Sequence, residues 1–281
     1  MASKEIIFVA KPTSWTEKIY PGYLRFCKEF HAKLKQYHKI EILDLPDIWV
    51  RDFLPVQNHK TGQLHQMFFA PRYANYTPKF TLNIRKAVQK YFPRVKSCRL
   101  RIDGGNIILN PECGTIFCFE KQTIFCKSKF WEKHKAEQCL KNALGAKRVV
   151  WLPHETGDKI CHIDGYMQFL GNKLFISDEA PFCGKILWLK RQKALAPFIN
   201  IGNIVLLPCM ADESDYLSAK GIYVNFLETS VAVFVPQYNL PYDKEIIKIM
   251  RKHISKPIIG IDCSQIAEYG GAVHCLTREY K

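Results

Sequence analysis

Long apolar runs are absent from this sequence of 281 residues. No stretch of about 18 consecutive apolar residues occurs, so we expect no transmembrane helix. The opening, MASKEIIFVAKPTSW, has too short an apolar segment and too early a charge for a secretory signal, and residues 5–10 are predicted to form a strand. No linker or low-complexity stretch interrupts the chain. We therefore predict a single domain over residues 1–281.

The cysteines lack the spacing of metal or disulfide sites. No C-x-x-C pair occurs, and the cysteines and histidines do not show the spacing of zinc ligands, which argues against a metal site. The count of eleven cysteines is odd, and several lie in apolar runs such as TIFCFEKQTIFC, where a free cysteine acts as a small hydrophobe. This usage favours the reduced interior of a cytoplasmic protein.

Acidic residues are few relative to basic ones. The chain has 26 Asp and Glu residues against 41 Lys and Arg residues, which gives a formal net charge of +15. Such a balance permits a nucleic-acid partner or another acidic partner. The basic residues are dispersed, however, and the densest stretch, residues 127–148, is typical of a solvated helix face. The charge by itself therefore does not favour a nucleic-acid function.

Strand-like and helix-like segments alternate along the whole chain, which predicts an α/β fold. Hairpins recur between the helices, so the order differs from that of a doubly wound sheet. Dividing the chain into five units gives roughly 56 residues for each, a length that suits a repeat. The expected strands and hairpins are 5–10, 40–43, 106–119, 148–153, 166–177, 203–208, 223–236 and 257–262. The expected helices are 23–37, 79–92, 131–145, 187–198 and 243–254.

Four short polar motifs interrupt the apolar pattern: DIWVRDFLPV (47–56), LRIDGGNIIL (100–109), ICHIDGYMQF (160–169) and YGGAVHCL (269–276). Each has an ordinary explanation. Trp49 fits a core aromatic, Arg51 and Asp52 fit a surface ion pair, and DGGN is a good turn sequence. His-x-Asp and a lone cysteine are also common in structural roles. Single motifs of this kind therefore do not identify a site.

Taken together, the motifs suggest one chemistry. Cys275 and His162 supply a nucleophile and a proton carrier, while the other members supply negative charge and an aromatic face. A guanidinium group matches this set, because its five N–H donors fit carboxylates in pairs and its plane stacks on a tryptophan ring. The predicted substrate is therefore a guanidinium compound attacked at its central carbon. The negative charge comes from Asp52, Asp103 and Asp164, and the aromatic face from Trp49.

The motifs resemble the agmatine deiminase and bacterial-type peptidyl-arginine deiminase family over almost the whole chain. WVRD, IDGGN, HIDG, the YVNFLETSVAVFVPQ hairpin and GGAVHCLT follow one another in the order of that family's motifs. The resemblance implies a five-bladed, pseudo-symmetric α/β propeller in which the last strand runs into the central site. It also implies hydrolytic deimination of agmatine or an arginine derivative, without a metal or organic cofactor.

The resemblance assigns a role to each matched residue. Cys275 is similar to the family's nucleophile, His162 to its general acid and base, and Asp52 and Asp164 to its guanidinium-binding carboxylates. Asp103 stands where the family carries a glutamate and is one methylene shorter. Cys161 stands where the family usually has glycine, and the chain lacks the tryptophan-rich opening of typical members. The remaining pocket positions that match the family are Trp49, Asn225 and Gly271.

Two other functions are consistent with the sequence. One is an amidinotransferase or another hydrolase of the same superfamily, which would not release ammonia. The other is a basic binding protein that has kept the fold but not the activity. The net charge of +15 suits the second, because the overall field would repel a small cationic substrate. The complete set of cysteine, histidine and aspartates favours the enzyme.

Overall fold

The computed structural model describes residues 5–71, 77–120, 133–155, 158, 160–179, 184–210 and 217–281. These residues form a mixed α/β fold with five small sheets of three strands each, in the spatial orders β15-β1-β2, β3-β4-β5, β6-β7-β8, β9-β10-β11 and β12-β13-β14. The strands are β1 (Ile6–Ala10), β2 (Lys39–Leu43), β3 (Val56–Gln57), β4 (Leu64–Gln66), β5 (Lys96–Ser97), β6 (Ile108–Asn110), β7 (Thr115–Phe119), β8 (Arg148–Leu152), β9 (Met167–Leu170), β10 (Lys173–Asp178), β11 (Ile204–Pro208), β12 (Leu227–Glu228), β13 (Val233–Gln237), β14 (Ile258–Asp262) and β15 (Arg278–Tyr280).

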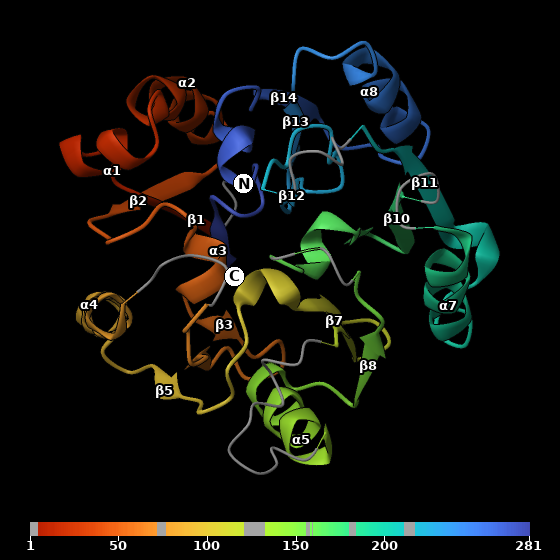
Figure 1. Cartoon of the computed structure of the whole chain (residues 1–281), viewed down its shortest axis with the longest axis horizontal. Helices are drawn as coiled ribbons and strands as arrows, with labels where there is room; N and C mark the ends of the chain where they lie inside the picture. The colour runs from red at the N-terminus through yellow and green to blue at the C-terminus, as the bar shows by residue number, and fades with distance from the viewer. Residues whose placement is uncertain are drawn as a thin grey trace.

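Every sheet follows the same pattern. Its first strand pairs antiparallel with its second, and its third strand pairs parallel with its second after a helical crossover. Figure 1 shows the crossover helices on the outside and the sheets arranged around the middle of the molecule. The helices are α1 (Ser14–Ile19), α2 (Tyr23–Lys35), α3 (Val50–Phe53), α4 (Pro78–Tyr91), α5 (Lys133–Leu144), α7 (Lys185–Leu195) and α8 (Asp243–Arg251).

Local sequence signals explain several of these boundaries. The Thr77 side chain caps α4 by accepting a hydrogen bond from the Phe80 N–H, and Pro78 occupies the first helical turn, where no N–H donor is needed. Gly171 has a φ of +57° in the turn between β9 and β10, which supports the predicted two-residue hairpin. The predicted strands and helices recur in the structure with shifts of a few residues at their ends.

The sequence predictions were incomplete for the shortest elements. The hairpin expected over 223–236 has a first strand of only two residues, β12, because residues 223–226 form a turn and irregular backbone ahead of it. The β3–β4 hairpin and the helices α1 and α3 were not predicted. Strands of two or three residues contain too little alternation for a pattern to stand out.

The C-terminal segment is tied into the fold by the first strand of the chain. β15 pairs antiparallel with β1, with Ile6 opposite Tyr280 and Phe8 opposite Arg278. The Tyr280 hydroxyl also donates a 2.7 Å hydrogen bond to the Pro55 carbonyl. The end of the chain is therefore held in place, and Cys275 lies in an anchored loop just before β15 (Figure 1).

The four polar motifs occupy equivalent places in successive units. Each follows the last strand of one sheet and precedes the first strand of the next, where it forms a single helical turn or loop. Helix α3 contacts the 3-10 helix η1 (Gly104–Asn106), which in turn contacts η2 (Ile163–Gly165). Figure 1 shows α3 near the middle of the molecule, with the chain end beside it. This arrangement gathers motifs that lie far apart in the sequence; the other two 3-10 helices are η3 (Ile201–Asn203) and η4 (Ile266–Tyr269).

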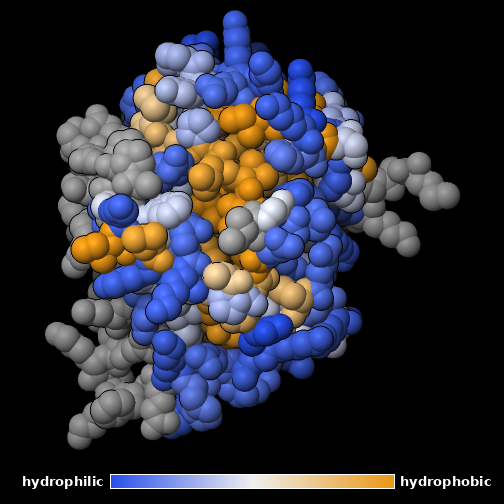
Figure 2. Space-filling model, turned by 90° about the vertical axis from the view of Figure 1, so that its right-hand side faces the viewer, coloured by the Kyte–Doolittle hydropathy of each residue, from blue (hydrophilic) through white to orange (hydrophobic). Residues whose placement is uncertain are grey.

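One face of the molecule carries an apolar area. Figure 2 shows it surrounded by hydrophilic residues on the side where α7 and β11 lie in Figure 1. The exposed large apolar side chains from this part of the chain are Ile186, Leu189, Leu206, Met210 and Leu217. Within the described ranges, no helix has both the length and the apolar character needed to cross a membrane.

Candidate active site

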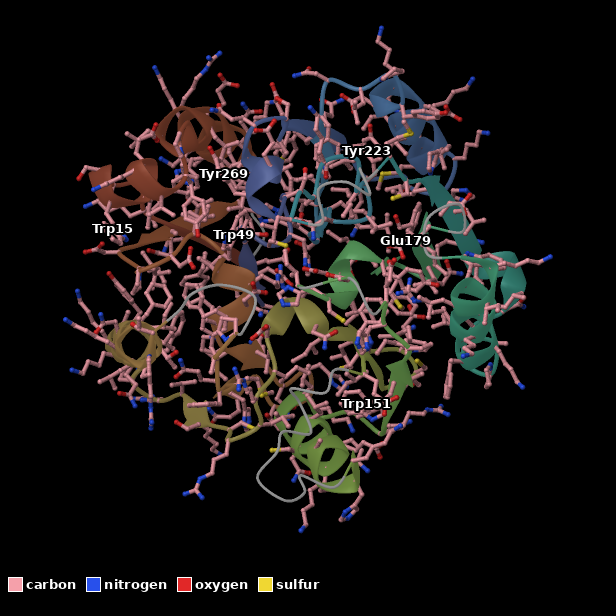
Figure 3. The ribbon with its side chains drawn as sticks, in the orientation of Figure 1. Trp15, Trp49, Trp151, Glu179, Tyr223 and Tyr269 are labelled. Carbon is pink, nitrogen blue, oxygen red and sulfur yellow. The ribbon has the colours of Figure 1, made fainter. Side chains whose placement is uncertain are left out.

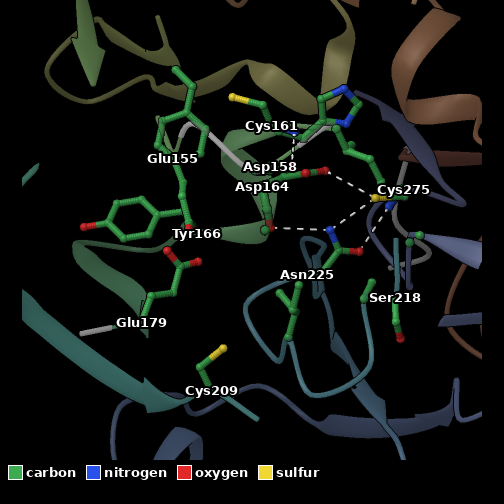
Figure 4. Close-up of a pocket in the computed structure, with 18 of the residues that line it drawn as sticks. Glu155, Asp158, Cys161, Asp164, Tyr166, Glu179, Cys209, Ser218, Asn225 and Cys275 are labelled. Carbon is green, nitrogen blue, oxygen red and sulfur yellow. Dashed lines mark hydrogen bonds between the residues drawn. The ribbon is translucent and has the colours of Figure 1, made fainter. Parts of the chain in front are cut away.

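Cys275 lies in a ring of polar side chains at the middle of the molecule. Its sulfur lies 3.6 Å from the Asp164 Oδ2 atom and accepts a 3.2 Å hydrogen bond from the Asn225 Nδ2 group. The Asn225 Oδ1 atom accepts hydrogen bonds from the backbone N–H groups of Ala272 and Cys275, which fixes the direction of the amide. The thiol is buried, and its contacts come from two distant segments besides its own loop (Figure 4).

His162 stands between two carboxylates. Its Nε2 atom lies 3.1 Å from Asp103 Oδ2, and its Nδ1 atom lies 3.4 Å from Asp52 Oδ1. The shorter side chain of Asp103 therefore reaches the imidazole. Because a carboxylate oxygen faces each ring nitrogen, an N–H group on either nitrogen has an acceptor within reach. Such a histidine can hold a proton and release it to a neighbouring leaving group.

Close approach explains the Gly-Gly pair of the second motif. The Gly105 N–H donates a 3.1 Å hydrogen bond to Asp52 Oδ1. A Cβ atom on Gly105 would lie 2.7 Å from both Asp52 Oδ1 and His162 Nδ1, so one of these buried side chains would have to move to admit it. DGGN is thus more than a turn sequence, because its second glycine makes room for a carboxylate and an imidazole.

The buried carboxylates carry an excess of negative charge. Burial, together with the charges of Asp103 and Asp164, raises the pKa of Asp52 to about 7, although His162 opposes the shift. Burial and the charges of Asp164 and Asp52 also raise the pKa of the Cys275 thiol well above its usual value. The thiol is therefore protonated at neutral pH while the site is empty, and a cation placed beside these carboxylates would favour the thiolate.

Asp164 remains ionised in this setting because of a residue that the sequence reasoning left without a role. Burial would raise the pKa of Asp164, but a hydrogen bond with His274, and the charges of His162 and Arg51, lower it below its usual value. The His274 Nδ1 atom lies 2.7 Å from Asp164 Oδ2. The histidine directly before Cys275 in the fourth motif was the available signal.

Arg51 and Asp52 do not form the surface pair considered from the sequence alone. Both side chains are buried, and Arg51 pairs with Glu279, with nitrogen–oxygen distances of 3.1 Å and 2.5 Å. The Arg51 Nε group also donates to the His274 carbonyl, and its backbone N–H donates to the Cys275 carbonyl. Arg51 therefore fixes the backbone of the segment that carries the thiol.

Trp49 is buried beside the site rather than exposed in it. Its ring meets Tyr20 edge-on with centroids 5.7 Å apart, and Figure 3 shows it on the inner side of α1. A Cβ atom on Gly271 would lie 2.5 Å from a carbon of the Trp49 ring. The absence of a side chain at Gly271 thus allows the indole to pack against the loop that holds Cys275.

A cavity of about 160 Å³ opens next to the thiol. This is about the size of an engineered cavity of roughly 150 Å³ that binds benzene, so it can hold a small organic molecule. The predicted site residues that line it are Cys275, His162, Asp164, Asn225 and Gly271, whereas Trp49, Asp52 and Asp103 lie behind this first layer. Among the described residues, no group of three or more histidine, cysteine or carboxylate side chains could hold a metal ion.

The end of the cavity away from Cys275 is acidic as well. Figure 4 shows Glu155 and Glu179 on the side opposite the thiol, and Asp158 also lines the cavity. Glu179 pairs with Arg191 at 2.5 Å, and the Arg191 guanidinium lies 4.5 Å from the centre of the Tyr166 ring. Burial raises the pKa of Glu179 to about 7, against the opposing effect of Arg191. No sequence motif pointed to this group.

Cys161 adopts a backbone conformation that favours glycine. Its φ is +55°, in the left-handed region, where a side chain is strained. The motif resemblance leads us to expect glycine at this position, and glycine would adopt this conformation without strain. The Cys161 N–H donates a 2.7 Å hydrogen bond to Asp158 Oδ1, which links the strained residue to the acidic end of the cavity.

The fold resembles several solved structures over nearly its full length. Agmatine deiminase from C. jejuni superposes with a TM-score of 0.79 and 20% identity, covering 99% of this chain and 94% of that one. A Cys-to-Ser form of that enzyme with substrate bound gives a TM-score of 0.78. The agmatine deiminase of Enterococcus faecalis gives a TM-score of 0.70 at 15% identity, covering 98% of this chain and 92% of that one. At these identities the likeness shows the fold alone.

Two sequence comparisons give the family of the chain. A Listeria monocytogenes protein named "Putative agmatine deiminase 2" is 24% identical over 219 residues, which are 66% of this chain and 56% of that protein. The model of the Porphyromonas-type peptidyl-arginine deiminases matches residues 25–280, from the second helix to the last strand. The match includes all four polar motifs and the Cys275 loop. The chain therefore belongs to the Porphyromonas-type peptidyl-arginine deiminase family.

Proposed function

We propose that this protein hydrolyses the guanidinium group of agmatine, releasing ammonia and a ureido product. The observation that carries the proposal is the position of the Cys275 thiol at one end of a small cavity, 3.6 Å from an Asp164 oxygen. A guanidinium carbon beside that thiol would have carboxylates available to bind its N–H groups. The family and the fold of the deiminase structures support the same chemistry.

The acidic far end of the cavity supports agmatine over arginine. Three carboxylates, those of Glu155, Asp158 and Glu179, line that end, and among the described residues that line the cavity Arg191 is the one arginine or lysine. A substrate tail that ends in an ammonium group would balance this charge, whereas the α-carboxylate of arginine would be repelled. We therefore propose a substrate with a cation at each end.

The proposed reaction proceeds through a covalent intermediate on Cys275. The bound guanidinium offsets the carboxylates that raise the pKa of the thiol, so the thiolate forms only when substrate is present. Its sulfur attacks the central carbon and forms a C–S bond. A C–N bond then breaks, and His162 gives a proton to the departing ammonia.

A water molecule completes the proposed cycle. His162, now neutral, takes a proton from the water as its oxygen bonds to the same carbon. The C–S bond breaks, the thiolate is restored, and the product leaves with a C=O group in place of one C–N unit. Asp52 and Asp103 hold the imidazole from both sides through these proton transfers. No step needs a metal or an organic cofactor.

The repeated ββαβ pattern also supports a finer description of the fold. We propose that the five sheets are the blades of a pseudo-symmetric α/β propeller, that residues 1–281 form a single catalytic domain, and that the polar motifs meet on its axis. The nine free cysteines among the described residues suit a reducing compartment such as the cytoplasm.

Ammonia release from a panel of substrates tests the proposal. The panel contains agmatine, arginine, a peptide with C-terminal arginine and a protein with internal arginines, each assayed with Cys275→Ala as the control. Release from agmatine that depends on Cys275 is the expected result. Release from arginine alone would overturn the assignment of the far end, and a transferase would consume agmatine without free ammonia. If none of the four substrates releases ammonia, a binding protein without this activity is favoured.

A further inference from the structure

The carboxylate that contacts the nucleophile is held by the residue next to the nucleophile in sequence. Asp164 Oδ2 lies 3.6 Å from the Cys275 sulfur and 2.7 Å from the His274 Nδ1 atom. One oxygen atom therefore faces both side chains. His274 and Asp164 come from segments that are 110 residues apart, so the fold, rather than chain proximity, creates this contact.

His274 itself has little freedom to move. Its side chain is buried, its backbone N–H donates a 3.1 Å hydrogen bond to the Asn225 carbonyl, and its carbonyl accepts from the Arg51 Nε group. Burial and the charge of Arg51 lower the pKa of His274, which favours the neutral imidazole. A neutral imidazole with its proton on Nδ1 donates to the Asp164 oxygen, whereas the other tautomer would place a lone pair against it.

We propose that His274 is a positioning residue for the proposed deimination: its Nδ1–H group donates to Asp164 Oδ2 and holds that oxygen in place beside the Cys275 sulfur. The inference rests on the proposed function for its kinetic consequences, but the proton position can be measured without turnover. His274 acts through Asp164, since the residues that line the cavity do not include His274 itself. The charged and titratable groups that face this pair are Arg51, Glu279, His162, Asp52 and Cys275.

Two substitutions of His274 separate the hydrogen bond from simple packing. His274→Asn keeps an N–H donor near the position of Nδ1, and His274→Leu fills the space without a donor. We expect His274→Leu to lower kcat for agmatine about 100-fold and the asparagine variant to stay within about 10-fold of wild type. Loss of the donor also raises the pKa of Asp164, so the acidic limb of the pH profile of kcat/KM should move to higher pH in the leucine variant. Equal losses in both variants, with an unchanged pH profile, would overturn the proposal.

Nitrogen-15 NMR of labelled histidine tests the same contact in the unliganded protein. The expected signal for His274 is a neutral imidazole protonated at Nδ1, and Asp164→Asn should remove the preference for that tautomer. A His274 ring protonated at Nε2 alone would overturn the positioning role. Because this measurement needs no substrate, a protein that shows the Nδ1–H tautomer but releases no ammonia would refute the proposed function and leave the contact established.

A separate observation concerns two cysteines away from the cavity. The sulfur atoms of Cys98 and Cys139 lie 2.9 Å apart, and both residues are partly exposed. Cys98 follows β5 in the segment that leads to Asp103, and Cys139 lies in α5. The Leu100 N–H donates to the Cys98 sulfur at 3.4 Å. The Cys98 thiol, by donating to the other sulfur, lowers the pKa of Cys139 to about 7.

We infer that Cys98 and Cys139 form a reversible dithiol–disulfide site that responds to hydroperoxides. The Cys139 thiolate attacks a peroxide oxygen, the O–O bond breaks, and Cys139 becomes a sulfenic acid as the alcohol or water leaves. The Cys98 sulfur then attacks the Cys139 sulfur, and hydroxide leaves as water with the Cys98 proton. The sulfurs must approach to about 2.05 Å, a movement of roughly 1 Å from their present separation.

Peptide mass spectrometry after treatment with hydrogen peroxide tests this site. The expected product is a cross-linked pair of peptides that contain Cys98 and Cys139, with two hydrogens lost and full recovery on reduction. The cross-link should raise the melting temperature, because it shortens the free loop of the unfolded chain. Cys98→Ser and Cys139→Ser should each abolish both effects, and Cys113→Ser should keep them. Oxygen added to Cys139 without a cross-link in the wild-type protein would overturn the inference.

Discussion

The two ends of the cavity are both acidic and buried, yet their charges are balanced in different ways. At the Cys275 end, three aspartates face one another, and their partners are two imidazoles and a backbone N–H group. At the far end, Glu179 has a full ion pair with Arg191, whose guanidinium lies 4.7 Å from the centre of the Phe119 ring as well. The carboxylates of the first end have imidazoles as hydrogen-bond partners, whereas at the second end one of three carboxylates is paired with a guanidinium.

This difference suggests a division of labour within the proposed reaction. At the Cys275 end, the positive charge of a bound substrate would lower the pKa values of Asp52 and of the Cys275 thiol, which the neighbouring carboxylates raise. The far end is built around an existing ion pair, so it offers a preformed wall for the tail of the substrate. Changes at the first end should act on the chemical step, and changes at the second on binding and specificity.

Removing the nucleophile should produce the largest effect. We expect Cys275→Ala to lower ammonia release from agmatine by at least about 10⁴-fold, because the substitution removes the proposed nucleophile. The carboxylates remain, so agmatine should still bind, which isothermal titration calorimetry measures. Cys113→Ala, in the turn between β6 and β7, is the matched control and should turn over normally. Turnover by Cys275→Ala near the wild-type rate would refute the division between the two ends.

Neutralising one central aspartate should separate activity from stability. We expect Asp52→Asn to lower kcat about 100-fold, because it removes charge that balances His162 and the substrate. The free energy of unfolding of this variant at pH 8, by contrast, should rise. In the folded protein the pKa of Asp52 is raised to about 7, above its unfolded value of about 3.9. The protonated side chain therefore contributes stability that is fully present below about pH 3.9 and is lost as the pH rises through 7.

Urea unfolding at two pH values measures this effect. Relative to wild type, Asp52→Asn should gain about 2 kcal/mol more at pH 8 than at pH 5, because the variant has no carboxylate to ionise. The gain should shrink when a cationic ligand occupies the site. An Asp52→Asn variant less stable than wild type at pH 8 would show that the ionised Asp52 side chain stabilises the fold through its partners.

Neutralising Glu179 at the far end should change KM more than kcat. Glu179→Gln leaves Arg191 buried without its carboxylate partner, but we expect much of that loss of stability to be offset at pH 8, because burial raises the pKa of Glu179 to about 7 and its ionised form is therefore disfavoured there. The KM for agmatine should rise about 10-fold, with kcat within about 3-fold of wild type, and discrimination against arginine should fall. Glu228→Gln, which breaks a half-exposed pair with Lys256, should cost less than about 1 kcal/mol. A fall in kcat with unchanged KM for Glu179→Gln would place that residue in the chemical step.

Sequence reasoning succeeded where a signal was local. The hairpin was predicted over 166–177 because a glycine turn separates two apolar runs, and it is found over 167–178. The central residues were predicted because each lies in a short polar motif. The five-unit organisation also followed from the alternation of segments, and five similar sheets are found. The roles given to Cys275 and His162 remain predictions, although the fold brings both to the same cavity.

The far end of the cavity had no such signal. Glu179 ends one hairpin, Arg191 lies in the middle of a charged helix, and Phe119 ends a buried strand. Each residue is ordinary for its element, and only the packing of neighbouring sheets turns them into a wall with a buried ion pair. His274 was closer to recognition, since it stands beside the thiol in sequence. The pairing of His274 with Asp164 was not predictable, because the two residues are 110 positions apart in the sequence.

The smallest expected effect concerns the packing that supports the Cys275 end. A methyl group on Gly271 would lie 2.5 Å from the Trp49 ring and 2.9 Å from the Cys275 Cβ atom, so Gly271→Ala should destabilise the protein by about 1–3 kcal/mol. Gly165→Ala is the matched control on the same cavity, because its added methyl group would meet only Ile222, at an ordinary 3.9 Å. We expect the control to change stability by less than about 0.5 kcal/mol. Equal stabilities of the two variants in urea would show that the Trp49 ring yields freely, and that the Cys275 end is held by its hydrogen bonds rather than by this contact.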